Sequence, residues 1–505
     1  MLKDVYDLVV IGGGINGVGI ARDAAGRGLS VLLCEKGDLA EGTSSRSGKL
    51  IHGGLRYLEH YEFRLVREAL KEREVLLQAA PHIVWPMRFV LPHGGGQRPA
   101  WLLRLGLFLY DHLYLRRHLP GSRSLDLARA PEGAPLQKHY RKAFEYSDCW
   151  VEDARLVVLN ALDAAARGAR VLPRTACVAA RREEGLWRIE LQEQGGARHR
   201  VSARSLVNAA GPWVDQVLAG VLGRSGPKRV RLVRGSHIVV RKHYAGSQAY
   251  LFQNDDRRVI FVNPYEGDYL LIGTTDIPHE EGPERVEVSR AEVTYLCGVV
   301  NRWFERQIGP EDVLYSFSGV RPLYDDSREN PSAVTRDYVF DLEAGEGAPL
   351  LSIFGGKITT YRKLAEAALQ RLRPFHPSMG GAWTANVPLP GGDLPGANFD
   401  AFLAELRQRR PWLPEKMAHR LARAYGTRVE ELLGGAERME DLGRHFGGGL
   451  TEREVDYLRE REWAITAEDI LWRRSKLGMH LAPAEQARLI EWLEAGGDRQ
   501  QRAGA

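Results

Sequence analysis

The stretch "DVYDLVVIGGGINGVGIARDAAGRGLSVLLCEKGD", residues 4–38, predicts a strand, a glycine turn, a helix and a second strand. The apolar run at 8–11 has the length of a buried parallel strand. Gly12, Gly14 and Gly17 form the pattern G-x-G-x-x-G. Such glycines permit a tight turn and let the backbone approach a pyrophosphate at the positive end of the helix dipole. This order of elements is typical of a Rossmann-like unit that binds a dinucleotide.

The kind of dinucleotide is indicated by Glu35 and by segments far from the glycine pattern. Glu35 closes the second strand, where an acid accepts hydrogen bonds from an adenosine ribose. No arginine stands beside it, and this disfavours a cofactor with a 2′-phosphate. Further polar or glycine-rich segments occur at Thr43, Ser44, Ser45, 208–213, Gly355 and Gly356. Remote segments that converge on one cofactor suit the long FAD molecule, whereas one contiguous domain normally suffices for NAD. The alternative for Ser44 and Ser45 is that they only cap a turn.

The remaining sequence predicts a cofactor domain assembled from discontinuous segments. A second strand, glycine turn and helix lie at 350–372, and strands rich in β-branched residues precede them. We therefore expect an α/β plus α+β chain, with a Rossmann-like FAD-binding domain, an inserted substrate domain built on an antiparallel sheet, and an all-helical C-terminal cap. The expected boundaries are 1–80, 150–228 and 316–378 for the FAD-binding domain, 81–149 and 229–315 for the substrate-binding domain, 379–397 for a linker and 398–505 for the helical domain.

Composition and charge narrow the class of protein. The chain has 505 residues, of which 44% are hydrophobic and 27% charged, as is typical of a globular protein of two or three domains. The net charge of +5 is small for this length, and basic clusters that would indicate nucleic-acid binding are missing. Four cysteines without a C-x-x-C pair argue against a metal or iron–sulfur site and fit a reducing cytoplasm.

One segment has the character of a membrane-surface helix. No apolar run reaches the roughly 18 residues of a membrane span, and no leader sequence precedes the first strand. The nearest candidate is "WLLRLGLFLYDHLYLRR" at 101–117, which Arg104 and Asp111 interrupt. Its leucines, aromatics and flanking arginines predict either an interfacial helix on a bilayer or an amphipathic helix packed against its own domain. The arginine-rich C-terminal stretch "AHRLARAYGTRVEELL" at 418–433 is a second candidate for membrane docking.

Longer motifs resemble one enzyme family along essentially the whole chain. Besides the glycine pattern they are "TSSRSGKLIHGGLRYLEH", "FEYSDCWVEDARL", "GSHIVV", "IGTTD", "SGVRPL", "TRDY", "FGGKITTYRKLAE", "DLGRHFG" and "ILWRRSKLGM". Together they resemble the FAD-dependent, aerobic glycerol-3-phosphate dehydrogenases of bacteria, within the glycine and D-amino-acid oxidase-like flavoproteins. The resemblance implies oxidation of sn-glycerol 3-phosphate to dihydroxyacetone phosphate by hydride transfer from C2 to N5 of FAD, with electrons passing to membrane quinone. It also implies a peripheral protein, usually a homodimer, on the cytoplasmic face of the inner membrane.

A phosphorylated alcohol requires a clamp for the phosphate and a group that manages the hydroxyl proton. By resemblance Arg56, Tyr57 and Arg336 bind the substrate, and a planar guanidinium suits phosphate oxygens. His237 is a candidate base because imidazole accepts a proton near neutrality. The alternative is that Arg321 stabilises the forming alkoxide without proton transfer.

The resemblance places the other predicted residues around the cofactor. Lys357 joins His237 and Arg321 as a predicted catalytic residue, and it either supports the negative charge of a reduced flavin or touches the substrate. The predicted cofactor-binding residues are Gly12, Gly13, Gly14, Asn16, Gly17, Glu35, Thr43, Ser44, Ser45, Lys49, His52, Gly53, Val178, Gly211, Trp213, Gly355, Gly356 and Thr359. The alternative for Lys49 and His52 is a structural role, and the alternative for Thr359 is that it only caps a helix.

Other functions stay open from the sequence alone. No second redox centre is visible, so reduced flavin must meet either quinone or oxygen directly. An oxidase of the same fold would make hydrogen peroxide. A flavin-dependent RNA-modifying protein and a non-catalytic FAD scaffold are further alternatives, and the modest charge disfavours the first of these.

Overall fold

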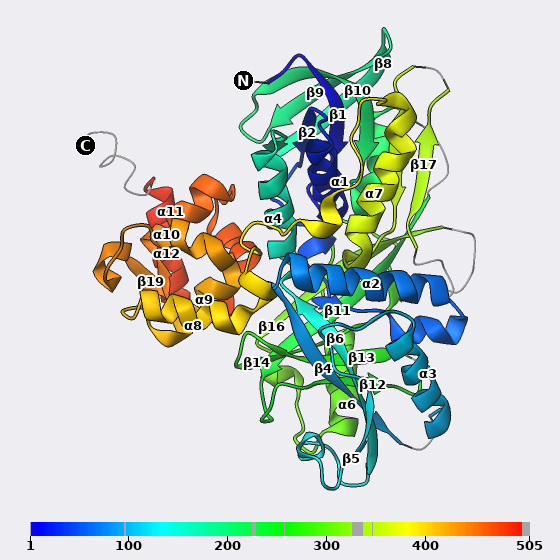
Figure 1. Ribbon diagram of the computed structural model, residues 1–505, viewed down its shortest axis with the longest axis vertical. Helices are drawn as coiled ribbons and strands as arrows, with labels where there is room; N and C mark the ends of the chain where they lie inside the picture. The colour runs from blue at the N-terminus through cyan, green and yellow to red at the C-terminus, as the bar shows by residue number, and fades with distance from the viewer. Residues whose placement is uncertain are drawn as a thin grey trace.

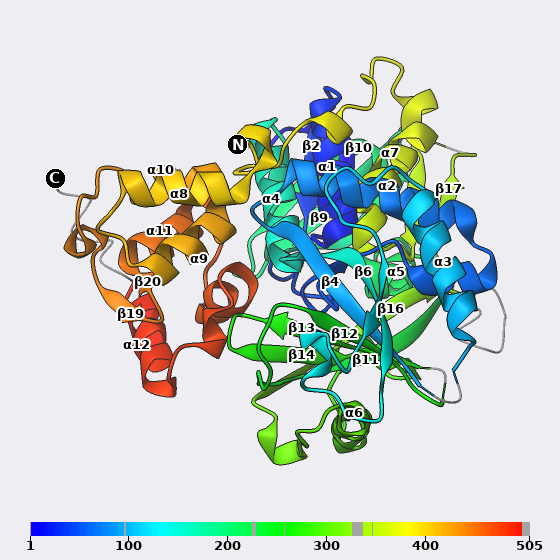
Figure 2. The same ribbon diagram turned by 60° about the horizontal axis from the view of Figure 1, so that its bottom comes forward.

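The computed structural model describes residues 2–94, 97–224, 229–256, 258–325, 337–345 and 347–496. The chain forms two stacked units and a helical domain at their side (Figure 1). The helical domain and helix α3 (Ala100–His112) lie on opposite sides of the molecule in Figure 1 and in the turned view of Figure 2.

The first unit is built on a sheet with a parallel centre. Its strands are, in order, β17 (Val339–Glu343), β18 (Leu350–Phe354), β10 (Arg198–Asn208), β1 (Val5–Ile11), β2 (Val31–Cys34) and β7 (Arg170–Leu172), with β9 (Leu186–Glu193) and β8 (Thr175–Glu183) attached to β10. β1 lies between β10 and β2 and is parallel to both. β2 and β18 are buried throughout, because elements on both sides cover a parallel sheet.

Three helices pack together against this sheet. They are α1 (Ile15–Gly26), α4 (Asp153–Ala166) and α7 (Tyr361–Leu372), grouped beside β1 and β2 in Figure 1. A Cβ on Gly19 would lie 2.8 Å from Cδ2 of Tyr361, so the missing side chain lets α1 and α7 approach closely. The first and last helices of the unit therefore meet although they are more than three hundred residues apart.

The second unit is a larger mixed sheet. Its strands are β15 (Ile277–Pro278), β11 (Val230–Arg241), β14 (Tyr269–Gly273), β13 (Val259–Tyr265), β12 (Ala249–Gln253), β4 (Val84–His93), β6 (Lys142–Val151) and β3 (Leu50–Ile51), with β16 (Tyr315–Tyr324) on β11 and β5 (Arg123–Asp126) on β6. Its pairs are antiparallel except that β12 and β4 are parallel. Helices α2 (Phe63–Ala79), α3 and α6 (Arg290–Trp303) surround it.

Strand pairing differs from the expected boundaries in two places. β16 pairs with β11 along its length, although the expected boundaries place its residues from 316 onward in the cofactor domain. β3 lies within the expected first segment, 1–80, but pairs with β6 of the second unit. The segment expected as a linker, 379–397, is also fastened to the body, since Leu389 is buried and its N–H donates to the Ala79 carbonyl over 2.8 Å.

The C-terminal domain has its own apolar core. Its elements are α8 (Phe399–Arg409), α9 (Glu415–Tyr425), α10 (Val429–Leu433), α11 (Glu452–Arg461), the π-helical segment η13 (Asp469–Arg474) and α12 (Pro483–Glu494), together with the short hairpin β19 (His445–Gly447) and β20 (Leu450–Thr451). Within the described part of the chain, no helix has both the length and the apolar character needed to cross a bilayer.

Candidate active site

A cavity of about 2180 Å³ is lined by elements of both units. It begins at the glycine turn between β1 and α1 and follows the 35–59 segment to the floor formed by β11 and β16. The turn after β18 closes another side through Gly355, Gly356 and Lys357. Segments that are remote in sequence therefore meet around one space, as the glycine-rich pattern predicts.

The glycine turn leaves no room for side chains. Gly12 has φ +115°, and a Cβ there would lie 2.5 Å from the Ala209 carbonyl oxygen. A Cβ on Gly17 would collide with the carbonyl of Gly12. Gly12 and Gly14 line the cavity, and no side chain caps α1 at Gly14. Backbone N–H groups at the start of α1 therefore face a space suited to a phosphate.

Glu35 holds the glycine turn directly. Its Oε2 accepts the N–H of Gly13 over 2.7 Å, and its Oε1 accepts the N–H of Gly37 over 2.8 Å. Burial raises the pKa of the Glu35 carboxyl, against the lowering effect of these two hydrogen bonds. Glu35 lines the cavity, whereas Gly13 and Gly17 support it from behind.

The predicted 43–49 residues separate into two groups. Thr43 and Ser44 line the cavity: the Ser44 hydroxyl accepts the N–H of Ile15 over 3.0 Å, and the Thr43 hydroxyl donates to the Val320 carbonyl over 2.7 Å. Ser45 and Lys49 do not line it. The Lys49 ammonium is buried and lies 2.9 Å from Oδ1 of Asp153, which corresponds to the structural alternative for this lysine.

His52 and Gly53 lie at the other end of this segment. His52 lines the cavity, and its N–H donates to the Thr359 hydroxyl over 3.3 Å. Gly53 lies behind the lining, where its N–H donates to the Tyr110 hydroxyl over 2.8 Å. Val178 does not line the cavity either, although its neighbour Cys177 does.

The turn after β18 is tied to the start of α1. Nδ2 of Asn16 donates to the Gly355 carbonyl over 3.1 Å, and a Cβ on Gly356 would lie 2.9 Å from the same nitrogen. Oδ1 of Asn16 is buried and has no protein partner among the described residues. Gly211 and Trp213 also line the cavity.

His237 lies on β11 with its ring against Phe317, the two ring centres 4.9 Å apart. A Cβ on Gly273, its partner on β14, would collide with this ring, so the glycine makes room for the histidine. Burial lowers the pKa of His237 to about 3, assisted by the positive charges of Arg321 and Lys49. Its Nδ1 has no hydrogen-bond partner among the described residues. His237 is therefore a neutral imidazole in the free protein.

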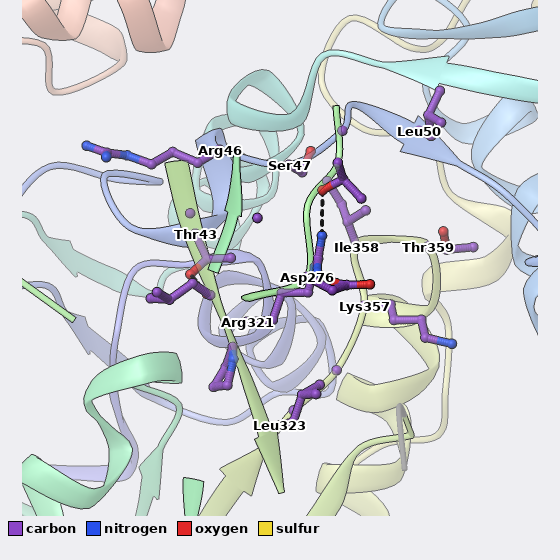
Figure 3. Close-up of a pocket in the computed structure, with 18 of the residues that line it drawn as sticks. Thr43, Arg46, Ser47, Leu50, Asp276, Arg321, Leu323, Lys357, Ile358 and Thr359 are labelled. Carbon is purple, nitrogen blue, oxygen red and sulfur yellow. Dashed lines mark hydrogen bonds and ion pairs between the residues drawn. The ribbon is translucent and has the colours of Figure 1, made fainter. Parts of the chain in front are cut away.

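Arg321 is held by two residues that sequence reasoning did not single out. Its guanidinium forms an ion pair with Asp276 and donates to the Thr274 hydroxyl over 2.7 Å. Figure 3 shows Arg321 and Asp276 together in the cavity, with Lys357, Ile358 and Thr359 along a neighbouring segment. The signal in the sequence was the motif "IGTTD", which contains both partners.

Three further cationic side chains, those of Arg46, Arg56 and Lys357, line the cavity. Arg56 and Tyr57 line the cavity from η2 (Leu55–His60), and the Lys357 ammonium lies 3.9 Å from the centre of the Tyr57 ring. Arg46, which was not predicted, also lines the cavity and donates to the Ser318 carbonyl over 3.2 Å. Arg336 lies outside the described residues.

Comparison with known families shows the family to which the chain belongs. Residues 7–362 match the model of FAD-dependent oxidoreductases. The chain belongs to this family. Residues 382–493 match a second model, the C-terminal domain of alpha-glycerophosphate oxidase. The predicted fold class and FAD as the cofactor are thereby confirmed.

Several curated relatives match nearly the whole chain. D-erythritol 1-phosphate dehydrogenase of Brucella abortus is 60% identical over 97% of this chain and 98% of its own. Glycerol-3-phosphate dehydrogenase of Pseudomonas aeruginosa is 57% identical over 98% and 96%. Aerobic glycerol-3-phosphate dehydrogenase of Escherichia coli is 52% identical over 97% of both chains. The predicted family resemblance is therefore confirmed.

A solved structure agrees with this assignment. The glycerol-3-phosphate dehydrogenase of Bacillus halodurans, complexed with FAD, superposes with a TM-score of 0.76 at 27% identity, covering 98% of this chain and 94% of that one. The residues described above fit FAD, because the glycine turn, Ser44 at the start of α1 and Asn16, whose Oδ1 has no partner among the described residues, all border one cavity.

Proposed function

We propose that this chain oxidises sn-glycerol 3-phosphate to dihydroxyacetone phosphate, with the C2 hydride passing to N5 of FAD and the electrons passing on to a membrane quinone. The observation that carries the proposal is one cavity that joins the glycine turn to Arg56, His237, Arg321 and Lys357. Relatives named glycerol-3-phosphate dehydrogenase at 57% and 52% identity support the choice of substrate.

The substrate phosphate is assigned to Arg56 and Tyr57, with Arg336 as a further candidate. Gly54 has a left-handed backbone conformation and immediately precedes η2, and Arg56 within η2 lines the cavity. An arginine fork binds two phosphate oxygens at once, which fixes the position of the rest of a small substrate. Lys357 lies next to Tyr57 and adds positive charge on the same side.

The C2 hydroxyl is assigned to the wall formed by His237 and Arg321. His237 lines the cavity as a neutral imidazole, which is able to accept a proton, and a nearby anionic substrate raises its pKa because opposite charges favour the protonated form. Arg321 stabilises negative charge on the substrate oxygen, and Asp276 and Thr274 fix its direction. The two groups thus share the task of moving the proton and holding the charge.

We assign α3 as the surface through which the protein meets the membrane that contains the electron acceptor. Trp101, Leu105 and Phe108 on this helix are 68%, 47% and 50% exposed. Leu102 and Leu109 of the same helix line the cavity, so an apolar surface and the reaction space share one helix. A peripheral protein that rests on the cytoplasmic face of a bilayer through α3 would let a quinone approach from the lipid.

A second substrate has support from one relative. The Brucella abortus protein, at 60% identity, is named for D-erythritol 1-phosphate, which also carries a phosphate on a polyol. The ratio of kcat/KM for the two phosphates decides between them. A ratio above roughly tenfold in favour of sn-glycerol 3-phosphate supports the proposal, and the reverse ratio assigns the four-carbon substrate.

The decisive experiment uses the FAD-loaded protein without oxygen. Addition of sn-glycerol 3-phosphate should bleach the flavin absorbance, whereas glycerol should not, because it lacks the phosphate. If neither sn-glycerol 3-phosphate nor D-erythritol 1-phosphate bleached the flavin, the proposed function would be refuted. Reoxidation is then followed with a ubiquinone analogue and with oxygen. Stoichiometric hydrogen peroxide, without quinone reduction, would assign an oxidase instead.

A further inference from the structure

The C-terminal domain reaches the FAD-binding unit through two arginines. Arg473 and Arg474 end the π-helical segment η13, and Figure 1 shows the C-terminal helices beside α4 of the first unit. Nε of Arg473 donates to Oδ2 of Asp38 over 2.6 Å. Arg474 donates to both oxygens of Asp38, each over 2.8 Å. All three side chains are buried, so this contact lies inside the domain interface.

Asp38 belongs to the loop formed by residues 35–41, which holds the glycine turn from two sides. Glu35 accepts the N–H of Gly13, as described above, and the N–H of Ala40 donates to the Gly13 carbonyl over 3.2 Å. Within the loop, the N–H of Asp38 donates to Oε2 of Glu41 over 2.6 Å. The arginine contact therefore fixes a loop whose two ends both bind Gly13.

The neighbouring charges strengthen this connection. Arg473 also donates to Asp469 over 2.5 Å, and Asp469 forms an ion pair with Arg174 of the first unit. The backbone N–H of Arg174 in turn donates to the Gly37 carbonyl over 2.8 Å. Buried bidentate pairs of this kind have little rotational freedom, so displacement of η13 would move the 35–41 loop.

We propose that the C-terminal domain forms part of the FAD site, because Arg473 and Arg474 hold through Asp38 the loop that positions Glu35 and the glycine turn. Arg473, Arg474 and Asp38 are positioning residues in this scheme. Thermodynamic linkage makes the effect reciprocal: docking of the domain raises the affinity for FAD, and bound FAD stabilises docking by the same factor.

The test measures FAD binding to the full chain from which the cofactor has been removed. Titration is followed by quenching of flavin fluorescence for the parent, Asp38→Asn, Arg474→Lys and Arg423→Gln. Arg423→Gln is the matched control, because Arg423 on α9 joins the C-terminal domain to another part of the body, where it donates to the Pro81 and His82 carbonyls over 3.3 and 3.5 Å.

We expect Asp38→Asn to raise the FAD Kd roughly tenfold or more, Arg474→Lys about threefold, and Arg423→Gln less than about twofold. If Asp38→Asn does not fold, Arg474→Lys tests the proposal in its place, because lysine keeps the positive charge but loses the bidentate contact with Asp38. An unchanged Kd in Asp38→Asn and Arg474→Lys, or an equal loss in Arg423→Gln, would overturn the proposal.

Hydrogen exchange gives a second readout that does not depend on activity. FAD should slow amide exchange at 469–476 in the parent protein and in Arg423→Gln. In Asp38→Asn the slowing should be clearly smaller, because only the contact through Arg174 and Asp469 still joins the loop to η13. Slowing by FAD that is as large in Asp38→Asn as in the parent would contradict the linkage.

Discussion

The Arg321 guanidinium and the Asp276 carboxylate form an ion pair on the cavity wall, beside the buried ring of His237. Arg321 therefore carries a compensating anion before any substrate enters. Its charge also lowers the pKa of His237, after the larger effect of burial. The pair thus fixes the direction of one candidate catalytic group, and its guanidinium contributes to the low pKa of another.

The first prediction concerns this pair. Arg321→Lys and Asp276→Asn should each lower kcat roughly tenfold, since each removes the fixed orientation of the guanidinium. The double variant should lose little more than either single one, because the two residues act as a unit. Steady-state kinetics on the three proteins measures the coupling. Effects that multiply in the double variant would mean that the two residues act independently and not as an ion pair.

The second prediction concerns phosphate recognition. Arg56→Ala should raise KM about thirtyfold, as expected for the loss of roughly 2 kcal/mol from a charge-assisted hydrogen bond. Arg67→Ala, at an exposed position of α2, is the control and should leave KM unchanged. If both variants keep the parent KM, the phosphate is bound elsewhere in the cavity.

The third prediction concerns the pH dependence of the reaction. The pKa of His237 is about 3 in the free protein, so this ring is already neutral throughout the usual assay range. The profile of kcat/KM, which reports the free enzyme, should therefore show no titration of His237 near neutrality. His237→Gln should still lower kcat roughly a hundredfold. A limb near the ordinary histidine pKa that disappears in His237→Gln would contradict the assigned protonation state.

The fourth prediction concerns the membrane. Trp101→Ser combined with Phe108→Ser should reduce co-sedimentation with anionic lipid vesicles and slow the reduction of a lipid-embedded quinone. Reduction of a water-soluble dye should stay unchanged, because the cavity is intact. Ile490→Ser, another exposed apolar side chain but in the C-terminal domain, is the control. Equal vesicle binding by all three proteins would remove α3 as the docking surface.

The fifth prediction concerns acid stability. His82 is fully buried without a hydrogen-bond partner among the described residues, and burial lowers its pKa from 6.5 to about 3. Between these values the unfolded chain binds a proton that the native state excludes, so stability falls as the pH falls through this window. His82→Leu should flatten the pH dependence of the unfolding free energy by about one proton. Urea unfolding at about pH 4.5 and pH 7.5 measures the change; an unchanged slope would show that His82 is not the group responsible.

Much of the fold and many residues of the cavity lining could be predicted from the sequence. The glycine pattern, Glu35 and the turn at Gly355 follow backbone rules that depend on local residue type, so their positions in the cavity could be anticipated. Lys49 could not be placed in this way. Its ammonium is buried against Asp153, a residue that is remote in the sequence and adjacent only because β3 pairs with β6.

The amino-acid sequence by itself determined the family, the cofactor and the discontinuous cofactor domain, because strand periodicity, glycine spacing and long motifs are local properties of the chain. Only the tertiary structure decided which charges meet. Asp276, in the loop between β14 and β15, meets Arg321 of β16 on the far side of β11, and Asp38 meets Arg474 across more than four hundred residues. Such pairs are selected by burial and packing of the assembled units, where an unpaired charge is costly, and no local pattern specifies the partner.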